Sequence, residues 1–125
     1  MISHIHSVTI AVRDQDAALD FYTNVLGWEK VIDQPMGPDM RFLTVVPPGA
    51  ATQLVLAHES WAAEFVKRGG PTGISFITRD IDETHKTFSG RGVRFKEPIE
   101  MMPWGQRATW FFDIDDNEFF LNEEK

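Results

Sequence analysis

The chain offers few side chains that could carry out nucleophilic, acid–base or metal chemistry. It has four histidines and no cysteine. Disulfides, thiolate metal ligands and cysteine nucleophiles are therefore excluded, which agrees with a reducing cytoplasm. The histidines are His4, His6, His58 and His85, and their spacing matches no metal-binding motif. We expect His85 to face solvent from a helix, so local motifs favour no metal centre.

Serine and carboxylate side chains add no clear catalytic group. Ser7 has no histidine on its own strand face that could activate it as a nucleophile. Glu97 and Glu100 fall in a long connection, and Glu118 stands next to a turn. A general base is therefore not evident in the sequence.

Size and charge narrow the classes of function. The chain has 125 residues and a formal net charge of −7. This size predicts one compact domain, and nucleic-acid binding is disfavoured because it needs a basic face. An acidic surface could attract a cationic ligand. We find no signal-peptide pattern and no apolar stretch near ~20 residues, so we expect a cytoplasmic protein without membrane contact.

The chain contains one pattern twice. Val8 begins V-T-I-A-V-R-D-Q-D, and Ile74, 66 residues later, begins I-S-F-I-T-R-D-I-D. A glycine follows each copy, Gly27 after the first and Gly92 after the second. A unit this short cannot bury its own hydrophobic face, so the two copies must pack or pair with each other or with another chain. A concave site is then expected between them.

Hydrophobic periodicity predicts the same order of elements in both copies. Four strands are expected in the first copy, over residues 5–13, 28–32, 41–46 and 53–57. Four more are expected in the second copy, over residues 73–79, 93–96, 107–112 and 118–122. A helix follows the first strand of each copy, capped by Asp14 or Asp16 and by Asp80 or Asp82.

This order predicts an α+β protein made of two βαβββ modules. We place the first module at residues 5–58, a linking helix and turn at 59–71, and the second module at 72–123, all within a single domain, 1–125.

Three segments of the sequence resemble the vicinal oxygen chelate superfamily, which includes glyoxalase I, bleomycin-resistance proteins and extradiol dioxygenases. They read V-T-I-A-V-R-D, F-Y-T-N-V-L-G and F-F-D-I-D-D-N-E-F-F-L, and the resemblance covers residues 5–123. The last turn reads D-I-D-D-N where the family commonly has D-P-D-G-N. The resemblance implies that the tandem modules form a curled mixed sheet around a cavity, with the helices on its outer face.

Enzymes of that superfamily hold a divalent metal through four side chains, and the resemblance places these at Ser7, Gln53, Gly73 and Phe120. Glycine and phenylalanine offer no ligand atom, and hydroxyl and carboxamide groups are poor ligands for a catalytic transition metal. We therefore expect no metal and no other cofactor. The alternative is a lyase of the glyoxalase I type, or a dioxygenase, that holds Zn, Ni, Mn or Fe through shifted ligands such as His6 and Glu118.

Strand parity and the resemblance together predict which side chains line the cavity. They are Ser7, Thr9, Gln53, Val55, Gly73, Ser75, Trp104, Trp110, Phe120 and Asn122. Apolar walls with a few hydroxyls and amides suit a neutral or aromatic organic ligand, and the aromatic rings could also stack on a flat or cationic one. The alternative is that the aromatic side chains fill the cavity.

The function favoured by the sequence is metal-free binding of a small organic molecule, as drug-binding resistance proteins do, with no evident catalysis. The metal-dependent lyase or dioxygenase is one alternative, and a non-catalytic interaction module is another. The resemblance also implies a homodimer, in which the modules could pair within a chain or be exchanged between chains.

Overall fold

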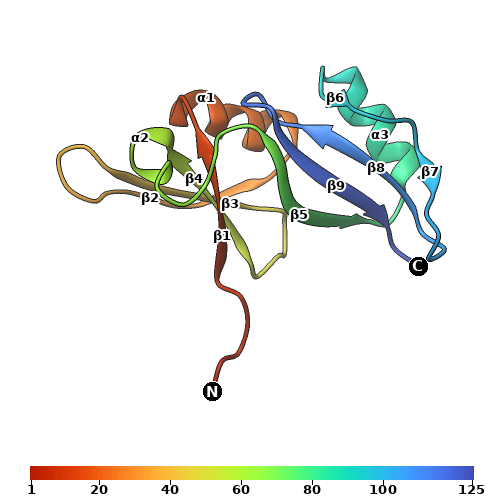
Figure 1. Cartoon of the computed structure of the whole chain (residues 1–125), viewed down its shortest axis with the longest axis horizontal. Helices are drawn as coiled ribbons and strands as arrows, with labels where there is room; N and C mark the ends of the chain where they lie inside the picture. The colour runs from red at the N-terminus through yellow and green to blue at the C-terminus, as the bar shows by residue number, and fades with distance from the viewer. The chain divides into compact units, whose positions relative to one another are not determined.

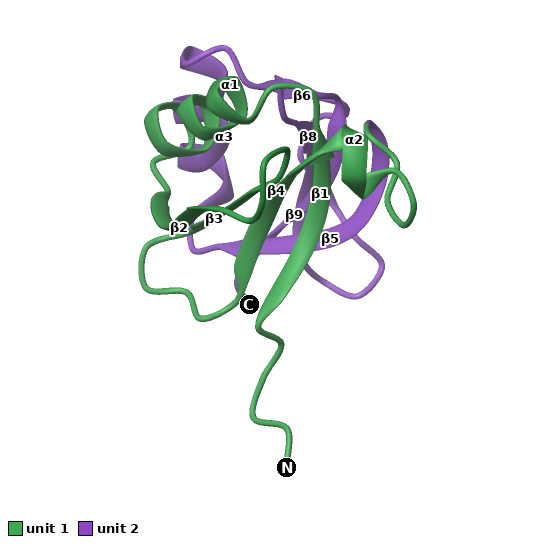
Figure 2. Ribbon diagram, turned by 90° about the vertical axis from the view of Figure 1, so that its left-hand side faces the viewer, with its two compact units in different colours: residues 1–68 green, residues 69–125 purple.

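Figure 2 shows the chain divided into two units, residues 1–68 and residues 69–125, in a computed structural model that describes all 125 residues. The division falls inside the predicted linking segment, because α2 (Glu59–Ala62) lies in unit 1 and β5 begins at Gly70. The module boundaries at 5–58 and 72–123 stay predictions. No helix is long and apolar enough to span a membrane.

Unit 1 contains one four-stranded sheet and its helices (Figure 1). Its elements before α2 are β1 (Ser7–Val12), α1 (Gln15–Asp20), β2 (Glu29–Pro35), β3 (Arg41–Val46) and β4 (Gln53–His58). The strand order is β1-β4-β3-β2, with β1 parallel to β4 and the other neighbours antiparallel. α1 continues as a π-helical turn, η1 (Phe21–Val25), and the chain turns at Gly27 with a φ of 80°.

Unit 2 repeats this topology. Its elements are β5 (Gly70–Thr78), α3 (Ile81–Gly90), β6 (Arg94–Phe95), β7 (Glu100–Met101), β8 (Arg107–Phe112) and β9 (Asn117–Glu123). The strand order is β5-β9-β8-β6, with β5 parallel to β9 and β7 paired to β8 off this path. Each unit therefore has a mixed sheet of βαβββ order, which confirms the predicted α+β fold class.

The repeated aspartates explain how each main helix begins. Asp14 Oδ1 accepts a hydrogen bond from Ala17 N at 3.0 Å, and Asp80 Oδ1 accepts one from Glu83 N at 3.1 Å. The first aspartate of each predicted pair is thus the N-cap, because its carboxylate reaches a backbone N–H that the helix leaves unpaired.

The second aspartate of each pair joins its helix to a strand of the same sheet. Asp16 accepts from Arg41 at the start of β3 at 2.7 Å, and Asp82 accepts two hydrogen bonds of 2.8 Å from Arg107 at the start of β8. The two arginines are also 66 residues apart. The duplication therefore extends to an ion pair that the sequence analysis did not find, although the same offset marked it.

The core of unit 2 is an aromatic cluster on one face of its sheet. Phe119 of β9 packs against Phe76 of β5 and Phe111 of β8, with ring centroids 5.1 and 5.5 Å apart. Phe88 of α3 contacts Phe111 at 6.2 Å. α3 therefore covers this face, and the residues of opposite parity lie on the other face of the sheet.

Candidate functional site

The four predicted cavity residues of unit 1 are direct neighbours in the sheet. Ser7 stands opposite Gln53, and Thr9 stands opposite Val55, in the parallel pairing of β1 with β4. Along each strand they share one face, because alternate residues point the same way. The structure therefore brings these four side chains together, as their parity predicted.

Part of this face is already filled by hydrophobic packing. Val55 is 3% exposed and belongs to a buried cluster with Ala11, Ala57 and Ala62, the last from α2. Three partly buried side chains pack against the cluster: Phe42, Trp61 and Val66. Ser7, Thr9 and Gln53 are partly exposed residues of this face. A linking helix was predicted here, but its packing on this face was not, because α2 lies outside the repeated pattern.

Two buried polar atoms in unit 1 have no hydrogen-bond partner. They are Gln53 Oε1 and Trp61 Nε1, and Trp61 packs on the face to which Gln53 belongs. Unpaired buried polar atoms are uncommon, and each costs about 1–3 kcal/mol. A rearrangement of either side chain that made a hydrogen bond would recover part of that energy.

Unit 2 carries three of its predicted residues as an aromatic platform, defined here as Trp104, Trp110 and Phe120. Trp110 and Phe120 are opposite each other on β8 and β9, with ring centroids 4.7 Å apart. The Trp104 ring meets Phe120 edge-on at 6.3 Å. Phe120 is also opposite Ser75 on β5. The platform lies on the sheet face opposite to α3.

The Trp104 side chain is held in place although half of its surface faces solvent. It is 52% exposed. Its indole Nε1 donates to Gln106 Oε1 at 2.9 Å, and Gln106 Nε2 donates in turn to the Glu123 carbonyl at 3.0 Å. Because its polar edge is already bonded within the protein, Trp104 presents its apolar ring surface to solvent.

The remaining predicted residues of unit 2 frame this platform. Asn122 is buried and stands opposite Ile77 on β5 and Ala108 on β8. Gly73 is exposed, has a φ of 75°, and lies where the β5–β9 register shifts between Pro71 and Ser75. A residue without Cβ adopts this left-handed conformation most easily, so Gly73 has a backbone role here.

Charged groups flank the platform at one end. Lys96 Nζ lies 3.1 Å from Glu118 Oε1, and the Glu118 side chain is only 10% exposed. The Arg94 guanidinium lies 5.2 Å from the centre of the Phe112 ring and donates to the Asp113 carbonyl at 3.1 Å. Sequence analysis did not find Lys96, because nothing in its spacing relates it to Glu118.

The histidines serve local structural roles or remain exposed. His58 caps α2 by accepting a hydrogen bond from Ser60 N at 3.1 Å. The His85 ring packs on Phe95 with centroids 4.2 Å apart, so the expectation that it faces solvent is wrong. His4 and His6 are exposed ahead of β1. Helix α3 lies close enough to β6 for ring stacking, which periodicity alone does not reveal.

The four positions that the resemblance places as metal ligands do not fit a catalytic metal. Gly73 has no side chain, and the Phe120 ring packs between tryptophans. The two pairs of positions also differ in strand register. Gln53 lies directly opposite Ser7, whereas Phe120 lies opposite Ser75 rather than Gly73, and Ser75 is the repeat equivalent of Thr9. No group of three or more His, Cys, Asp or Glu side chains could hold a metal ion.

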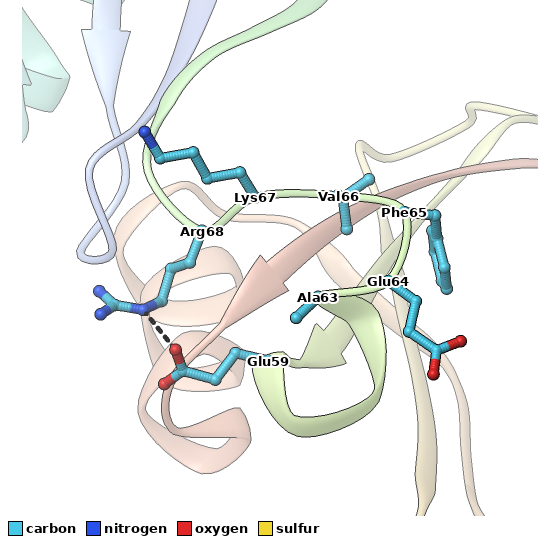
Figure 3. Close-up of a pocket in the computed structure, with 7 residues that line it drawn as sticks. All are labelled: Glu59, Ala63, Glu64, Phe65, Val66, Lys67 and Arg68. Atoms are coloured by element: carbon cyan, nitrogen blue, oxygen red, sulfur yellow. Dashed lines mark hydrogen bonds and ion pairs between the residues drawn. The ribbon is translucent and has the colours of Figure 1, made fainter.

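Two surface hollows of unit 1 lie away from the predicted residues. One has a volume of about 450 Å³ and contains an ion pair of 3.1 Å between Arg68 Nε and Glu59 Oε1, which Figure 3 draws as a dashed line. The other, of about 500 Å³, contains Asp33 and Arg41. Hydrogen bonding from Arg41 lowers the pKa of Asp33 to about 2. None of the ten predicted residues lines either hollow, and each hollow contains an ion pair, Arg68 with Glu59 in one and Arg41 with Asp33 in the other.

Residues 4–121 match the family model of the Glyoxalase/Bleomycin resistance protein/Dioxygenase superfamily. The uncharacterized protein YetH of Bacillus subtilis is 35% identical, over 98% of this chain and 100% of its own length.

Two solved structures extend this similarity. A member of the same superfamily from Sphaerobacter thermophilus is 63% identical, with a TM-score of 0.94 and 98% of each chain covered. TnmS3, an antibiotic binding protein from Streptomyces sp. CB03234, is 35% identical, with a TM-score of 0.86, covering 99% of this chain and 98% of its own.

Proposed function

Because the chain belongs to the Glyoxalase/Bleomycin resistance protein/Dioxygenase superfamily, we propose that it binds a small organic molecule with a flat ring. In this proposal, binding uses the sheet faces that carry the predicted residues, needs no metal and changes no covalent bond. The similarity to an antibiotic binding protein supports the class of function and identifies no ligand for this chain.

The observation that carries the proposal is the aromatic platform of unit 2. Trp104 and Trp110 both contact Phe120, with ring centroids 6.3 and 4.7 Å from it, and the exposed Trp104 is fixed by a hydrogen bond to Gln106. A ring that is already ordered loses little conformational entropy when a ligand stacks on it. Offset or edge-on contacts between aromatic rings contribute about 0.5–1.5 kcal/mol beyond the area they bury.

Polar neighbours complete the chemistry expected of such a site. Ser75 lies beside Phe120 on the sheet of unit 2 and contributes a hydroxyl group next to the platform. A mainly apolar surface with a few hydroxyl groups is typical of sites for small organic ligands. No nucleophile paired with a base accompanies these residues, so the proposal is binding without catalysis.

No observation favours the metal-dependent alternative. His6 is exposed ahead of β1, and Glu118 already pairs with Lys96 at 3.1 Å. We therefore propose no second function. The homodimer and the cytoplasmic location stay predictions, and sedimentation at micromolar concentration tests the first of them.

Thermal unfolding of the purified protein across a library of metabolites and antibiotics tests the proposal. A ligand at one hundred times its Kd should stabilise the native state by about 2.7 kcal/mol. Trp104→Ala should remove that stabilisation, because the exposed platform ring is lost. Phe65→Ala is the matched control, since Phe65 is a 62% exposed aromatic residue outside the predicted site.

Two outcomes would contradict the proposal. One is a ligand whose stabilisation survives Trp104→Ala unchanged, which would place binding away from the platform. The other is one tightly bound transition metal per chain, found by elemental analysis of the purified protein, which would restore the lyase or dioxygenase alternative.

A further inference from the structure

The carboxylate of Glu118 shares a sheet face with the aromatic platform. Glu118 and Phe120 are two positions apart on β9, so their side chains point the same way with bases about 7 Å apart. Glu118 stands opposite Phe112 on β8 and Pro71 on β5. Its side chain is 10% exposed. A carboxylate this deeply buried needs a cationic partner to remain charged at low cost.

Lys96 supplies that cation from the rim of the sheet. Its Nζ lies 3.1 Å from Glu118 Oε1, yet its side chain is 48% exposed. The Lys96 backbone N–H donates to the Trp110 carbonyl at 2.9 Å, which fixes the base of the side chain beside β8. A flexible four-carbon stem lets the ammonium group move into water while the backbone stays in place. The carboxylate is therefore held within the sheet, whereas the partly exposed ammonium group of Lys96 can be displaced into water.

The other cation at this end of the sheet is already engaged. Arg94 forms an ion pair with Asp116 and donates to the Asp113 carbonyl, while its guanidinium rests over Phe112. Lys96 is consequently the group that a ligand would displace in order to reach Glu118.

We propose that Glu118 recognises a cationic nitrogen group of the aromatic ligand, and that Lys96 is the counter-ion which this group displaces. The inference rests on the proposed function, because a ring on the platform brings the cationic group to Glu118. The ligand class is then an aromatic ring that carries an ammonium or related cation on a short substituent, because the side-chain bases of Glu118 and Phe120 are only about 7 Å apart. The net charge of −7 favours the approach of such a ligand.

This arrangement predicts that removing the charge of Lys96 and removing the charge of Glu118 change the affinity for a cationic ligand in opposite directions. In the native protein one cation replaces another, so the ligand's charge contributes little. When Lys96 is removed, the buried carboxylate lacks a counter-ion and a cationic ligand gains the whole interaction. When Glu118 loses its charge, a cationic ligand gains nothing over a neutral one.

Two matched probes separate charge from ring stacking. Naphthylmethylamine carries an ammonium group at neutral pH, and naphthylmethanol carries a neutral hydroxyl at the same place. Binding of each is followed through the indole N–H resonances of Trp104 and Trp110, assigned among the four tryptophans by Trp→Phe variants. Lys96→Met should tighten the Kd of the amine about tenfold and change that of the alcohol less than about twofold.

Glu118→Gln should make the two probes bind alike. Lys86→Met is the charge-matched control, since it removes the same charge from an exposed position on α3 and should leave the ratio of the two Kd values unchanged. Thermal unfolding of each variant shows whether it remains folded.

The inference is wrong if Lys96→Met leaves the ratio of the two Kd values unchanged, or if Glu118→Gln retains a preference for the amine. If neither probe moves a platform resonance in the folded native protein, while the library screen finds a ligand that depends on Trp104, the inference fails and the proposed function stands. If the library screen also finds no ligand that depends on Trp104, both the inference and the proposed function fail.

Discussion

The two units share one topology and expose very different amounts of the same sheet face. Ala11 of unit 1 is fully buried, whereas Ile77, 66 residues later on the equivalent strand of unit 2, is 61% exposed. In unit 1, α2 and Val66 pack on this face. Within residues 69–125 no such segment covers β5. Duplication thus repeats a fold, while the segments added between the copies determine which copy keeps an open surface.

The turns that precede the last strands of the two sheets, β4 and β9, are stabilised by different interactions. In unit 1, Pro47 and Pro48 form an exposed turn closed by one backbone hydrogen bond, Ala50 N to Pro47 O at 3.0 Å. In unit 2, the buried Asp113 organises the turn by accepting from Asp115 N at 2.8 Å and from Asn117 N and Nδ2, each at 3.0 Å. One turn relies on backbone stiffness, and the other on a buried carboxylate.

Asp113→Ala should therefore have the largest effect on stability. It leaves three hydrogen-bond donors without their acceptor, so the free energy of unfolding should fall by about 3 kcal/mol or more, measured in urea. Asp113→Asn should cost less, because Oδ1 still accepts two bonds. Pro48→Ala in the turn of unit 1 is the comparison, and an equal loss there would remove the distinction between the turns.

Exchanging side chains between Ala11 and Ile77 tests the difference in burial. Ala11→Ile inserts extra carbon atoms into a closed cluster and should destabilise the protein by about 1–3 kcal/mol, measured by urea or thermal unfolding. Ile77→Ala trims an exposed side chain and should change stability by about 0.5 kcal/mol or less. Equal effects would mean that both faces are covered in solution.

The ion pairs of the two repeated arginines predict a small difference at acid pH. The Arg41 guanidinium lowers the pKa of Asp33 from 3.8 to about 2. Because the folded pKa lies below the unfolded one, the contribution of Asp33 is fully present above about pH 4 and lost as the pH falls towards about 2. Both side chains are partly exposed, so it should stay below about 1 kcal/mol.

The measurement compares the unfolding free energy of Asp33→Asn with that of the native protein at neutral pH and near pH 2. The two should differ at neutral pH and converge in acid. Asp82→Asn in unit 2 is the matched control, since hydrogen bonding from Arg107 also lowers the pKa of Asp82 but the carboxylate is more exposed. If the difference in unfolding free energy persisted near pH 2, it would not come from the ionised carboxylate of Asp33.

Much of the local structure could be predicted from the sequence. The caps at Asp14 and Asp80 follow from one residue type at one place in each copy, and they were confirmed. The packing of His85 on Phe95 could not be predicted, because it depends on where β6 lies under α3. The cover over Val55 also escaped prediction, since α2 has no counterpart in the repeat.

In the candidate site, too, some features could be predicted from the sequence and others could not. Parity predicted that Ser7 and Thr9 share a face of β1 and that Gln53 and Val55 share a face of β4, because the period of a strand is fixed. The sequence could not predict that Gln106 holds the Trp104 indole, or that Lys96 reaches Glu118 from the segment that follows β6. Neither contact follows from the two-residue period of a strand or from the 66-residue repeat.

By itself, the sequence determined the duplicated βαβββ order, the caps of its helices and the side of each strand on which a residue lies, because these depend on local propensity and on the two-residue period of a strand. Only the tertiary structure decided which face of each sheet is covered, which ring is held at the surface and which carboxylate is paired. Those properties depend on how separate segments pack, and no local pattern in the chain encodes that packing.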